Sequence, residues 1–493
     1  MQDRYSFKNF IIVILVVTLY RLVMLFVASH QIDLYADEAY YWGWAQHFDW
    51  GYYSKPPMVA WLITIGTTVF GDDFVGIKIM SLVVYLFTTL NIYWLAKKLF
   101  DDRAIAFWSG VAFITLPAVW LSSLIISTDV PFLFFWSLAL LFFVKALKED
   151  RWYQWLLAGV AGGGGLLSKY TMIIFVVSAL AYLLTSPTHR RHLKNPKLYT
   201  AMIVAALVYA PNLWWNAHHR FISFHHVSHD NAHLTGLHFH LNKMLAFLGS
   251  QFGVFGPILF GWLLAILPRI GKVFRNEPFK LLWWFVVPMF VLILTISILS
   301  RAFANWSAPM YVAATVLTVA WLWRDGKKIW LYAAVGVNLL VGFLFYHLHD
   351  LAHLANVELT RKDPYKRVLG WRQVGERLSQ IARKYPNAKL LFDDRKLMAE
   401  MLYYVHPHPF DAVIWCPRCG EKGYLWRNHY EMTTDMRKHV GEDFLFVTSR
   451  RSIGDIARHF EGWQKVGTIR VPLYKDFVRE YRIYYLKHFE GYE

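Results

Sequence analysis

The stretch FIIVILVVTLYRLVMLFVAS (residues 10–29) decides the class of this protein. It is apolar apart from Arg21 and long enough to cross a bilayer, which takes about 20 residues of helix. Comparable runs recur along the chain, in which 56% of the 493 residues are hydrophobic and only 17% are charged. The sequence therefore predicts a polytopic α-helical membrane protein rather than a soluble enzyme. Its eleven candidate spans are residues 10–29, 77–95, 104–121, 130–147, 152–167, 170–185, 198–216, 249–267, 281–299, 306–323 and 329–347.

Basic residues mark one side of the membrane. Lysine and arginine gather in the N-terminal segment and in every second connection between the runs, namely 97–103, 145–151, 190–197, 269–280 and 324–328. Cytoplasmic loops carry such an excess, so these connections and the N-terminus are predicted to be cytoplasmic. Residues 58–70 are apolar but too short to span, and we interpret them as a helix in the interface. The net charge of +17 is then a topology signal, and no nucleic-acid partner is expected.

The chain divides into a membrane domain, residues 1–349, and a tail, residues 350–493. Because eleven spans begin from a cytoplasmic N-terminus, the tail is predicted to lie outside the cytoplasm. Amphipathic stretches alternate with strand-like runs in the tail, which predicts a small α/β domain. The predicted helices are 371–385, 395–405 and 452–460, and the predicted strands are 388–392, 412–415, 444–448, 466–471 and 482–486. Cys416 and Cys419 have two interpretations: a disulfide, or half of a zinc site completed by His406, His408 or His429.

Unusual polar residues collect in the loops assigned to the outer face, which are 30–76, 122–129, 168–170, 217–248 and 300–305. A charge beside a membrane is costly unless it has a role. The acidic pair Asp37-Glu38 stands among many Tyr and Trp residues, so we interpret it as part of a site rather than as a solvated pair. Asp129 has a structural interpretation as well, because it could cap the N-terminus of a helix. Lys169 also has one, because its side chain could extend to the lipid headgroups.

These residues suit the transfer of a sugar from a lipid-linked phosphate at the outer leaflet. The departing phosphate is an anion and needs cations, for which Lys55, Lys169 and Arg301 are the candidates. The acceptor needs a base, for which Asp37 is the candidate, with Glu38 as its supporting neighbour. The candidates for binding substrate are Tyr40, Tyr52, Tyr53, Asn305 and Trp306.

Two further features have a functional and a structural interpretation. The histidine-rich loop 217–248 contains His225 and His226, which are candidate ligands of a divalent metal ion, although the spacing matches no standard zinc pattern. No residue pattern indicates another cofactor. The glycine run 162–165 lacks the Gly-Lys-Ser/Thr that follows in a phosphate loop, so it predicts close helix packing inside a span.

Four landmarks resemble the membrane glycosyltransferases of the GT-C superfamily that use polyprenyl-phosphate sugars, a group that includes the protein O-mannosyltransferases and the lipid A 4-amino-4-deoxy-L-arabinose transferase. The landmarks are Asp37-Glu38, Tyr52-Tyr53-Ser54-Lys55-Pro56-Pro57, Asp129 ahead of Pro131, and Gly165-Leu166-Leu167-Ser168-Lys169. The segment Asn305-Trp306-Ser307-Ala308-Pro309 resembles a bacterial branch of the group. The resemblance covers roughly residues 5–350, and the tail is similar to the periplasmic α/β domain of the bacterial members.

The resemblance implies an inverting transfer from an undecaprenyl-phosphate-linked sugar to lipid A, lipopolysaccharide or another envelope glycan. It implies Asp37 as the main catalytic carboxylate, Asp129 as a second acidic residue, and Lys55 and Lys169 as contacts of the donor phosphate. It also implies the bacterial inner membrane and a periplasmic tail. Ser54 departs from the pattern, because relatives often carry there an acidic residue that helps to hold a metal, and this departure weakens the case for a metal at His225 or His226.

Two other functions fit the same residues. One is a transporter or flippase of a lipid-linked sugar, although transporters usually show paired repeats with broken helices near the midplane, whereas here the unusual residues gather at the outer ends of the spans. The other is a protein O-glycosyltransferase, which the tail makes less favoured because it resembles that of the lipid-modifying group. Formation of a new glycosidic bond separates an enzyme from a transporter.

Overall fold

The structure is a computed structural model that describes residues 2–226 and 239–492. Part of the histidine-rich loop therefore lies outside the described residues. The chain forms two compact units. The first, called the membrane unit, comprises Met1–Leu25, Lys55–Leu62 and Lys78–Leu348. The second, called the α/β unit, comprises Phe26–Ser54, Ile63–Ile77 and His349–Glu493.

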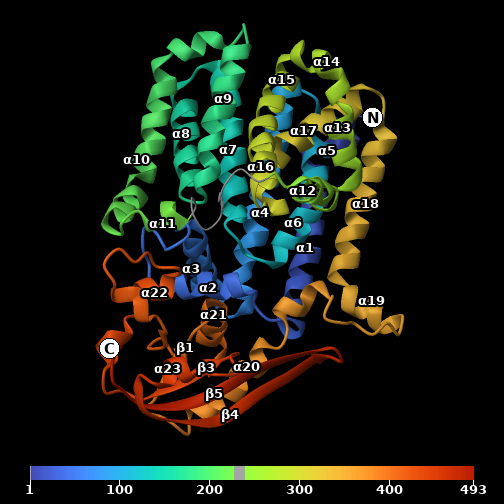
Figure 1. Cartoon of the computed structure of the whole chain (residues 1–493). Helices are drawn as coiled ribbons and strands as arrows, with labels where there is room; N and C mark the ends of the chain where they lie inside the picture. Colours follow the sequence, from blue (N-terminus) through green and yellow to red (C-terminus); the bar gives the residue numbers. More distant parts are fainter. Residues whose placement is uncertain (1, 227–238, 493) are drawn as a thin grey trace. The chain divides into compact units, whose positions relative to one another are not determined.

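The regular elements in the described part of the membrane unit are all helices, which are joined by turns and loops (Figure 1). Its short 3-10 helices are η1 (Gln2–Tyr5), η2 (Tyr170–Met172), η3 (Arg190–Lys194), η5 (Leu267–Arg269) and η6 (Ala304–Ser307). Its α-helices, two of which extend into the other unit, are α1 (Phe7–Gln31), α4 (Phe74–Phe100), α5 (Arg103–Ile114), α6 (Pro117–Leu124), α7 (Asp129–Glu149), α8 (Trp152–Leu166), α9 (Ile173–Thr185), α10 (Pro196–His218), α11 (Ile222–His225), α12 (Leu241–Val254), α13 (Pro257–Ala265), α14 (Ile270–Phe274), α15 (Glu277–Trp284), α16 (Val287–Leu299), α17 (Ala308–Arg324) and α18 (Lys328–Tyr346).

The apolar runs of the sequence are largely helical, but fewer than eleven of them form long single helices. Among the described residues, seven helical segments are long and apolar enough to cross a membrane, and the bent pair of α5 and α6 makes an eighth candidate. The helices α8, α9 and α17 are shorter. The predicted span 249–267 is divided between α12 and α13, since Pro257 begins a new helix after Gly256. The chain is thus a polytopic helical membrane protein with seven or eight candidate spans.

Two buried cations donate hydrogen bonds to main-chain carbonyls at the ends of α5 and α6, a bent pair whose axes meet at 51°. The helix breaks before Pro117, a residue that cannot continue the hydrogen-bond ladder. The Arg21 guanidinium donates to the Ile114 carbonyl at the end of α5, and it lies 4.3 Å from the Trp120 ring centroid. Lys78 Nζ donates to the Leu124 carbonyl at the end of α6, at 2.8 Å. The charge in the first apolar run thus has a carbonyl acceptor and an aromatic ring as partners inside the helical bundle.

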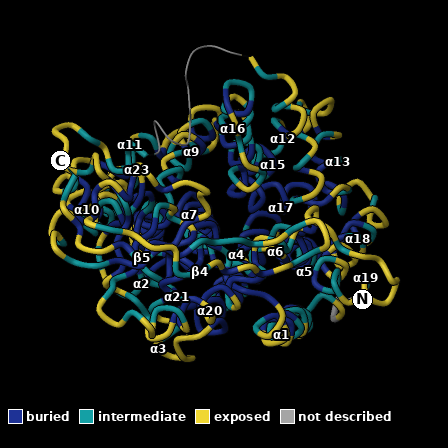
Figure 2. The backbone as a smooth tube through the Cα atoms, turned by 60° about the horizontal axis from the view of Figure 1, so that its bottom comes forward, coloured by how far each residue is buried: buried dark blue, intermediate teal, exposed yellow. Residues whose placement is uncertain are grey.

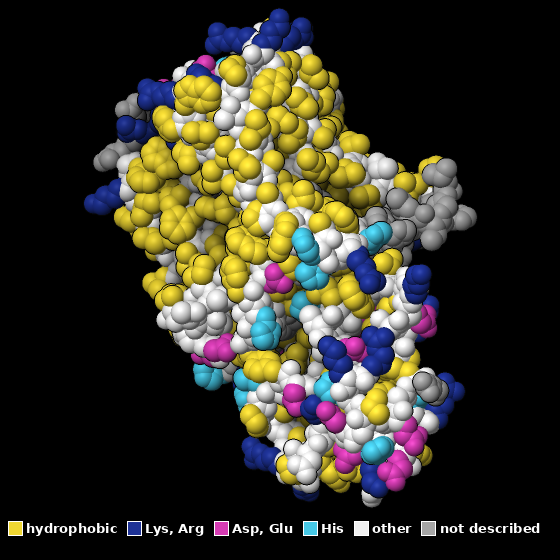
Figure 3. Space-filling view, turned by 90° about the vertical axis from the view of Figure 1, so that its left-hand side faces the viewer, with side chains coloured by type: hydrophobic (Ala, Val, Ile, Leu, Met, Phe, Trp, Pro, Cys, Tyr) yellow, Lys and Arg dark blue, Asp and Glu magenta, His cyan; other side chains and the backbone are white. Residues whose placement is uncertain are grey.

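Apolar side chains cover the outside of the membrane unit where α10 faces the viewer, and Lys and Arg gather at its upper end (Figure 3). α17, by contrast, is buried along nearly its whole length (Figure 2). A bilayer would cover the exposed apolar surface. α17 lies in the core of the unit and is enclosed by other helices. This arrangement agrees with a membrane domain.

The glycine run permits close packing between helices, as the sequence predicted. A Cβ added at Gly159 of α8 would lie 2.4 Å from the carbonyl oxygen of Ala201 in α10. At Gly163 it would lie 2.5 Å from the Val208 side chain, and at Gly164 2.5 Å from the Phe135 ring of α7. Hydrogen is therefore the only side chain that fits there without displacing a neighbour.

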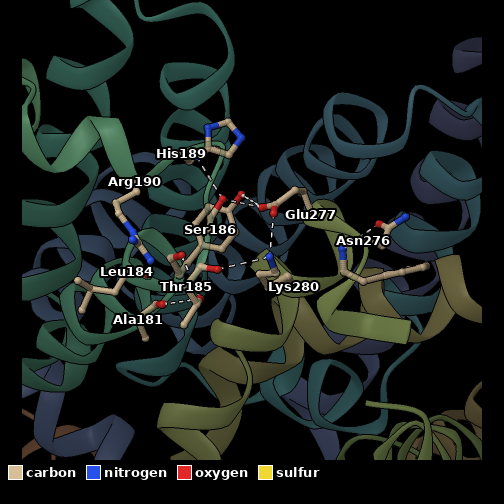
Figure 4. Close-up of polar contacts among 11 residues, drawn as sticks. Ala181, Leu184, Thr185, Ser186, His189, Arg190, Asn276, Glu277 and Lys280 are labelled. Atoms are coloured by element: carbon tan, nitrogen blue, oxygen red, sulfur yellow. Dashed lines mark hydrogen bonds and ion pairs between the residues drawn. The ribbon is translucent and has the colours of Figure 1, made fainter. Parts of the chain in front are cut away.

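A polar cluster joins two predicted cytoplasmic connections of the membrane unit (Figure 4). Glu277, the first residue of α15, accepts hydrogen bonds from Ser186 Oγ at 2.7 Å and from Lys280 Nζ at 2.8 Å. Tyr182 OH of α9 donates to the same carboxylate at 3.0 Å. The cluster ties the end of α9 to the start of α15, and we interpret it as structural.

The α/β unit contains a five-stranded sheet of order β2-β1-β3-β5-β4. Its strands are β1 (Lys389–Phe392), β2 (Val413–Ile414), β3 (Phe444–Thr448), β4 (Phe460–Tyr474) and β5 (Phe477–Phe489). β1 runs parallel to β2 and β3, while β5 runs antiparallel to β3 and to β4. The predicted α/β tail is therefore confirmed. The hairpin of β4 and β5 is much longer than predicted, because cross-strand pairing continues through exposed polar positions that lack an apolar signal.

The helices of the α/β unit include the first loop of the chain as well as the tail. They are α2 (Ala36–Ala45), α19 (Leu348–Leu354), α20 (Trp371–Ala382), α21 (Arg395–Tyr404), α22 (His429–Thr433) and α23 (Gly454–Ala457), with the 3-10 helices η7 (Pro364–Val368), η8 (Pro417–Gly420) and η9 (Met436–His439). α3 (Met58–Phe70), the predicted interfacial helix, contributes to both units. The predicted helix 452–460 shrinks to α23 because β4 begins at Phe460. Cys416 and Cys419 form a disulfide.

Candidate active site

Asp129 is the centre of a polar cluster in the membrane unit. It is the first residue of α7, and its two carboxylate oxygens have different partners. Lys169 Nζ donates to Oδ1 at 2.7 Å, and Asn305 Nδ2 donates to Oδ2 at 2.6 Å. Side-chain exposure is 6% for Asp129 and 15% for Lys169, so this is a buried ion pair. Asp129 is not a helix N-cap, since Thr128 holds that position, and Lys169 turns inward to a carboxylate rather than snorkelling.

The loop that carries Asn305 is held by a second set of hydrogen bonds. Ser307 Oγ and Tyr311 OH both donate to Oε1 of Gln251, at 2.9 Å and 2.6 Å. The Gln251 amide donates in turn to the Ala304 carbonyl of η6 at 3.3 Å. Gln251, Ser307 and Tyr311 are fully or almost fully buried. A buried network of this kind rigidifies the loop, so the position of Asn305 beside Asp129 is defined by α12 and α17.

The turn with the Lys-Pro-Pro triplet lies beside the turn with Lys169. Met58, just after Pro57, donates its main-chain N–H to the Leu167 carbonyl at 3.1 Å, two residues before Lys169. Lys55 itself is half-buried. Two lysines that are far apart in sequence are thus carried by neighbouring turns of the membrane unit. A pair of cations on neighbouring turns is suited to hold a phosphate group.

Asp37 and Glu38 occupy the first turn of α2 in the α/β unit. Glu38 is completely buried, and its Oε2 accepts the Tyr35 main-chain N–H at 2.9 Å, which caps the helix. The Asp37 side chain is 43% exposed. Acidic residues also suit this end of a helix electrostatically. Burial and capping give Glu38 a structural role, whereas the exposed carboxylate of Asp37 is accessible to a substrate.

Arg395 is a contact of Asp37 that sequence reasoning missed. Both of its Nη atoms lie 3.1 Å from Oδ1 of Asp37, and the guanidinium lies 4.5 Å from the centroid of the Tyr40 ring. Burial alone would lower the pKa of Arg395, but Asp37 and Tyr40 outweigh this effect and the pKa is raised. The available signal was weak: a basic Arg-Lys pair opens α21, where acidic residues are expected.

The three candidate tyrosines of the α/β unit are buried. Tyr40 is almost fully buried beneath Arg395, and burial raises its pKa. Tyr52 stacks on Trp44 at 4.8 Å and donates its hydroxyl proton to main-chain carbonyls of α2 and the following turn. Tyr53 is also buried. Their role in binding substrate stays a prediction.

The remaining candidates near η6 lie in the membrane unit. Arg301 is exposed, with its guanidinium 4.7 Å from the Phe303 ring centroid. Trp306 is half-buried and meets the edge of the same ring. Neither touches Asp129 among the contacts that the described residues make. Both therefore border the cluster rather than form part of it, and their roles stay predictions.

The candidate metal ligands lie apart from these residues in sequence. His225 ends α11, His226 follows it, and a metal at this pair stays a prediction. Of the described residues, only Cys416, Cys419 and Glu431 bring three ligand atoms of the His, Cys, Asp or Glu type together. The two sulfurs are joined in a disulfide, so they are not free thiolates. The structure therefore supports the disulfide interpretation over the zinc interpretation.

Comparison with known proteins identifies the family. The family model described as dolichyl-phosphate-mannose-protein mannosyltransferase matches residues 54–215. The lipid A galacturonosyltransferase RgtD of Rhizobium johnstonii is 34% identical over 448 residues, which are 90% of this chain and 91% of that protein. The chain belongs to this family of membrane glycosyltransferases. It is an enzyme that uses a polyprenyl-phosphate sugar donor, as predicted from the landmark residues.

Other relatives of this glycosyltransferase agree with the assignment. The undecaprenyl phosphate-alpha-4-amino-4-deoxy-L-arabinose arabinosyl transferase of Erwinia tasmaniensis is 30% identical over 175 residues, 34% of this chain and 31% of that protein. The crystal structure of ArnT from Cupriavidus metallidurans bound to undecaprenyl phosphate superposes with a TM-score of 0.65. That match has 15% identity and covers 97% of this chain and 98% of the other. The similarity shows that the fold is shared.

Proposed function

We propose that this glycosyltransferase transfers a sugar, with inversion, from an undecaprenyl-phosphate-type donor to lipid A. The single observation that carries the proposal is the similarity to a lipid A galacturonosyltransferase along nearly the whole chain. The two lysines on neighbouring turns, Lys169 and Lys55, support it, because a leaving phosphate needs cations. Galacturonic acid is the first donor sugar to test, with lipopolysaccharide core as a further acceptor.

The proposed chemistry is a single displacement at the anomeric carbon. A hydroxyl oxygen of the acceptor forms a bond to that carbon, and the bond from carbon to the phosphate oxygen breaks. The hydroxyl proton passes to the carboxylate of Asp37, which acts as the base. Polyprenyl phosphate leaves as an anion, and Lys55 and Lys169 neutralise the developing charge. Asp129 keeps Lys169 in place, and Arg301 is an additional candidate for the phosphate.

The proposed topology follows the basic connections. The N-terminus and the connections that contain η3, Arg275 and Lys327 lie in the cytoplasm, and the α/β unit lies in the periplasm of a bacterial inner membrane. In this proposal α8, α9 and α17 count as spans despite their length, which restores eleven. α17 supports this view because a helix enclosed by other helices does not have to match the bilayer thickness with its own apolar length.

A protein acceptor is the second candidate, and the matched family description favours it. The experiment that separates the two is a transfer assay with purified enzyme in detergent, undecaprenyl-phosphate galacturonic acid as donor, and either lipid A or a mixture of envelope proteins as acceptor. Mass spectrometry should show one added sugar on lipid A. Sugar on protein alone would contradict the proposed acceptor, and donor hydrolysis without any glycosylated product would contradict transfer.

Asp37→Asn should abolish transfer to lipid A, because an amide cannot accept the acceptor proton. Asp101→Asn is the matched control, since Asp101 is a carboxylate with a 94% exposed side chain on a remote connection. Lys55→Ala should raise the KM for the donor by at least about tenfold, corresponding to a lost charge-assisted contact of roughly 1.4 kcal/mol or more, while the KM for lipid A changes little. Activity retained in Asp37→Asn would rule out Asp37 as the base.

A further inference from the structure

Arg395 stands at an electrostatically unfavourable place for a basic residue. It is the first residue of α21, whose N-cap Asp394 accepts the Leu397 N–H at 2.8 Å. The next residue is Lys396, and the first turn contains no acidic side chain. Positive charge at a helix N-terminus opposes the helix dipole and is unfavourable there. The helix dipole therefore does not explain Arg395, and its contacts with other side chains become the relevant observation.

The surroundings of Arg395 hold its guanidinium in one orientation. α2 packs against α21, and the Tyr40 ring of α2 lies under the guanidinium at 4.5 Å. The Tyr40 hydroxyl accepts the main-chain N–H of His429 at 2.5 Å, which fixes the ring from the other side. A planar guanidinium on an aromatic face is pre-organised, so it loses little conformational freedom when it binds a carboxylate.

The contact with Asp37 is asymmetric. Nη1 and Nη2 of Arg395 both lie 3.1 Å from Oδ1 of Asp37. Across residues 2–226 and 239–492, the hydrogen bonds to the Asp37 carboxylate both go to Oδ1. One oxygen of the carboxylate is thus held and the other is available. A side chain that is 43% exposed and anchored at one oxygen keeps a defined direction while its second oxygen can meet a ligand.

We propose that Arg395 is the positioning residue of this glycosyltransferase: it holds Oδ1 of Asp37 and directs Oδ2 toward the acceptor hydroxyl. The inference rests on the proposed role of Asp37 as the base. Proton transfer requires the base within hydrogen-bond reach of the hydroxyl, and a misplacement of about 1 Å can cost about 100-fold in rate. Arg395 then adds to catalysis a side chain that the landmark motifs do not include.

The test compares three variants of the full-length enzyme in the lipid A transfer assay. Arg395→Ala should lower kcat about 100-fold with little change in the KM for the donor. Arg395→Lys should retain part of the activity, because an ammonium group can still contact Oδ1 but cannot form the two-pronged contact. Lys396→Ala is the matched control, since Lys396 is a neighbouring exposed cation on the same turn, and it should behave as the unmodified enzyme.

Chemical rescue separates positioning from a purely structural effect. Guanidinium chloride at millimolar concentration should restore a measurable part of kcat to Arg395→Ala and should leave Asp37→Asn inactive. Thermal unfolding checks that each variant is folded. If Arg395→Ala is not folded, the kcat of Arg395→Lys provides the test. A normal kcat in Arg395→Ala, or a folded variant of low kcat that guanidinium does not rescue, would overturn the inference.

The outcomes also distinguish this inference from the proposed function. If Asp37→Asn retains transfer, Asp37 is not the base and the proposed function of that residue fails. If Asp37→Asn is inactive while Arg395→Ala has a normal kcat, the base assignment survives and only the positioning role of Arg395 is wrong.

Discussion

Asp129 shows how one buried carboxylate joins two distant parts of the membrane unit. Its two oxygens accept from Lys169 and Asn305, and both charges of the ion pair are largely removed from solvent. A buried ion pair contributes little net stability compared with apolar residues, but removing one partner leaves the other charge buried and uncompensated. The pair is therefore weak evidence for stability, and it is consistent with the role in phosphate binding proposed above for Lys169.

Asp129→Asn should lower the free energy of unfolding by about 3 kcal/mol, since it leaves Lys169 without its counterion. The double variant Asp129→Asn with Lys169→Met should recover much of that loss and still be inactive. Thermal unfolding in detergent together with the transfer assay measures both effects. Asp101→Asn, which removes a partner of the exposed pair with Lys97, should change stability by less than about 1 kcal/mol. Equal destabilisation in the two single variants would contradict a buried pair.

At the scale of elements, α8 determines how closely its neighbours approach. Its glycines face α10 and α7, and the space for an added Cβ differs sharply from one glycine to the next. Small residues let helix backbones approach closely in a membrane, where packing rather than the hydrophobic effect drives association. Because α8 ends just before Lys169, its packing also places the turn that carries this lysine.

Gly159→Ala and Gly162→Ala form a matched pair on α8. The new Cβ would lie 2.4 Å from a main-chain oxygen of α10 at Gly159 but 3.4 Å from the Ala205 Cβ at Gly162. Gly159→Ala should destabilise the protein by about 1–3 kcal/mol, as overpacking does, whereas Gly162→Ala should be neutral or slightly stabilising because alanine favours helix. Melting temperatures in detergent check the difference. Similar melting temperatures would show that α10 shifts to accommodate the methyl group.

On the scale of the whole molecule, the distribution of basic residues predicts which ends of the helices face the cytoplasm. The basic connections and the α/β unit are assigned to opposite sides of the membrane by this distribution. Both cysteines of the chain are joined in a disulfide, so an introduced cysteine is the single free thiol. This property makes the proposed topology directly measurable.

Lys475→Cys and Arg151→Cys should differ in their reaction with a membrane-impermeant maleimide. The two basic side chains are exposed, at 85% and 64%. In intact spheroplasts the reagent should label Lys475→Cys only, because the α/β unit is periplasmic in the proposal, and lysis should expose Arg151→Cys. Labelling of Arg151→Cys in intact spheroplasts would show that the topology is inverted.

The sequence predicted some elements well and missed others for physical reasons. Apolar runs marked the helices of the membrane unit because burial in lipid or core demands apolar residues over a whole span. The eleven predicted spans are not all long single helices. The length of an apolar run does not show that the helix bends at Pro117 or that a new helix begins after Gly256. In the α/β unit the strand positions were right, but the long hairpin was underestimated because its outer positions are polar.

The sequence alone determined the membrane class, the glycosyltransferase family resemblance and the two lysines and two aspartates of the candidate site. These follow from composition and from local motifs, which need no knowledge of distant contacts. Only the tertiary structure showed that Lys169 and Asn305 share Asp129, that Gln251 and Tyr311 hold the Asn305 loop, and that Arg395 contacts Asp37. Each of these contacts joins residues far apart in the chain, and it arises from how helices and loops pack rather than from any local pattern.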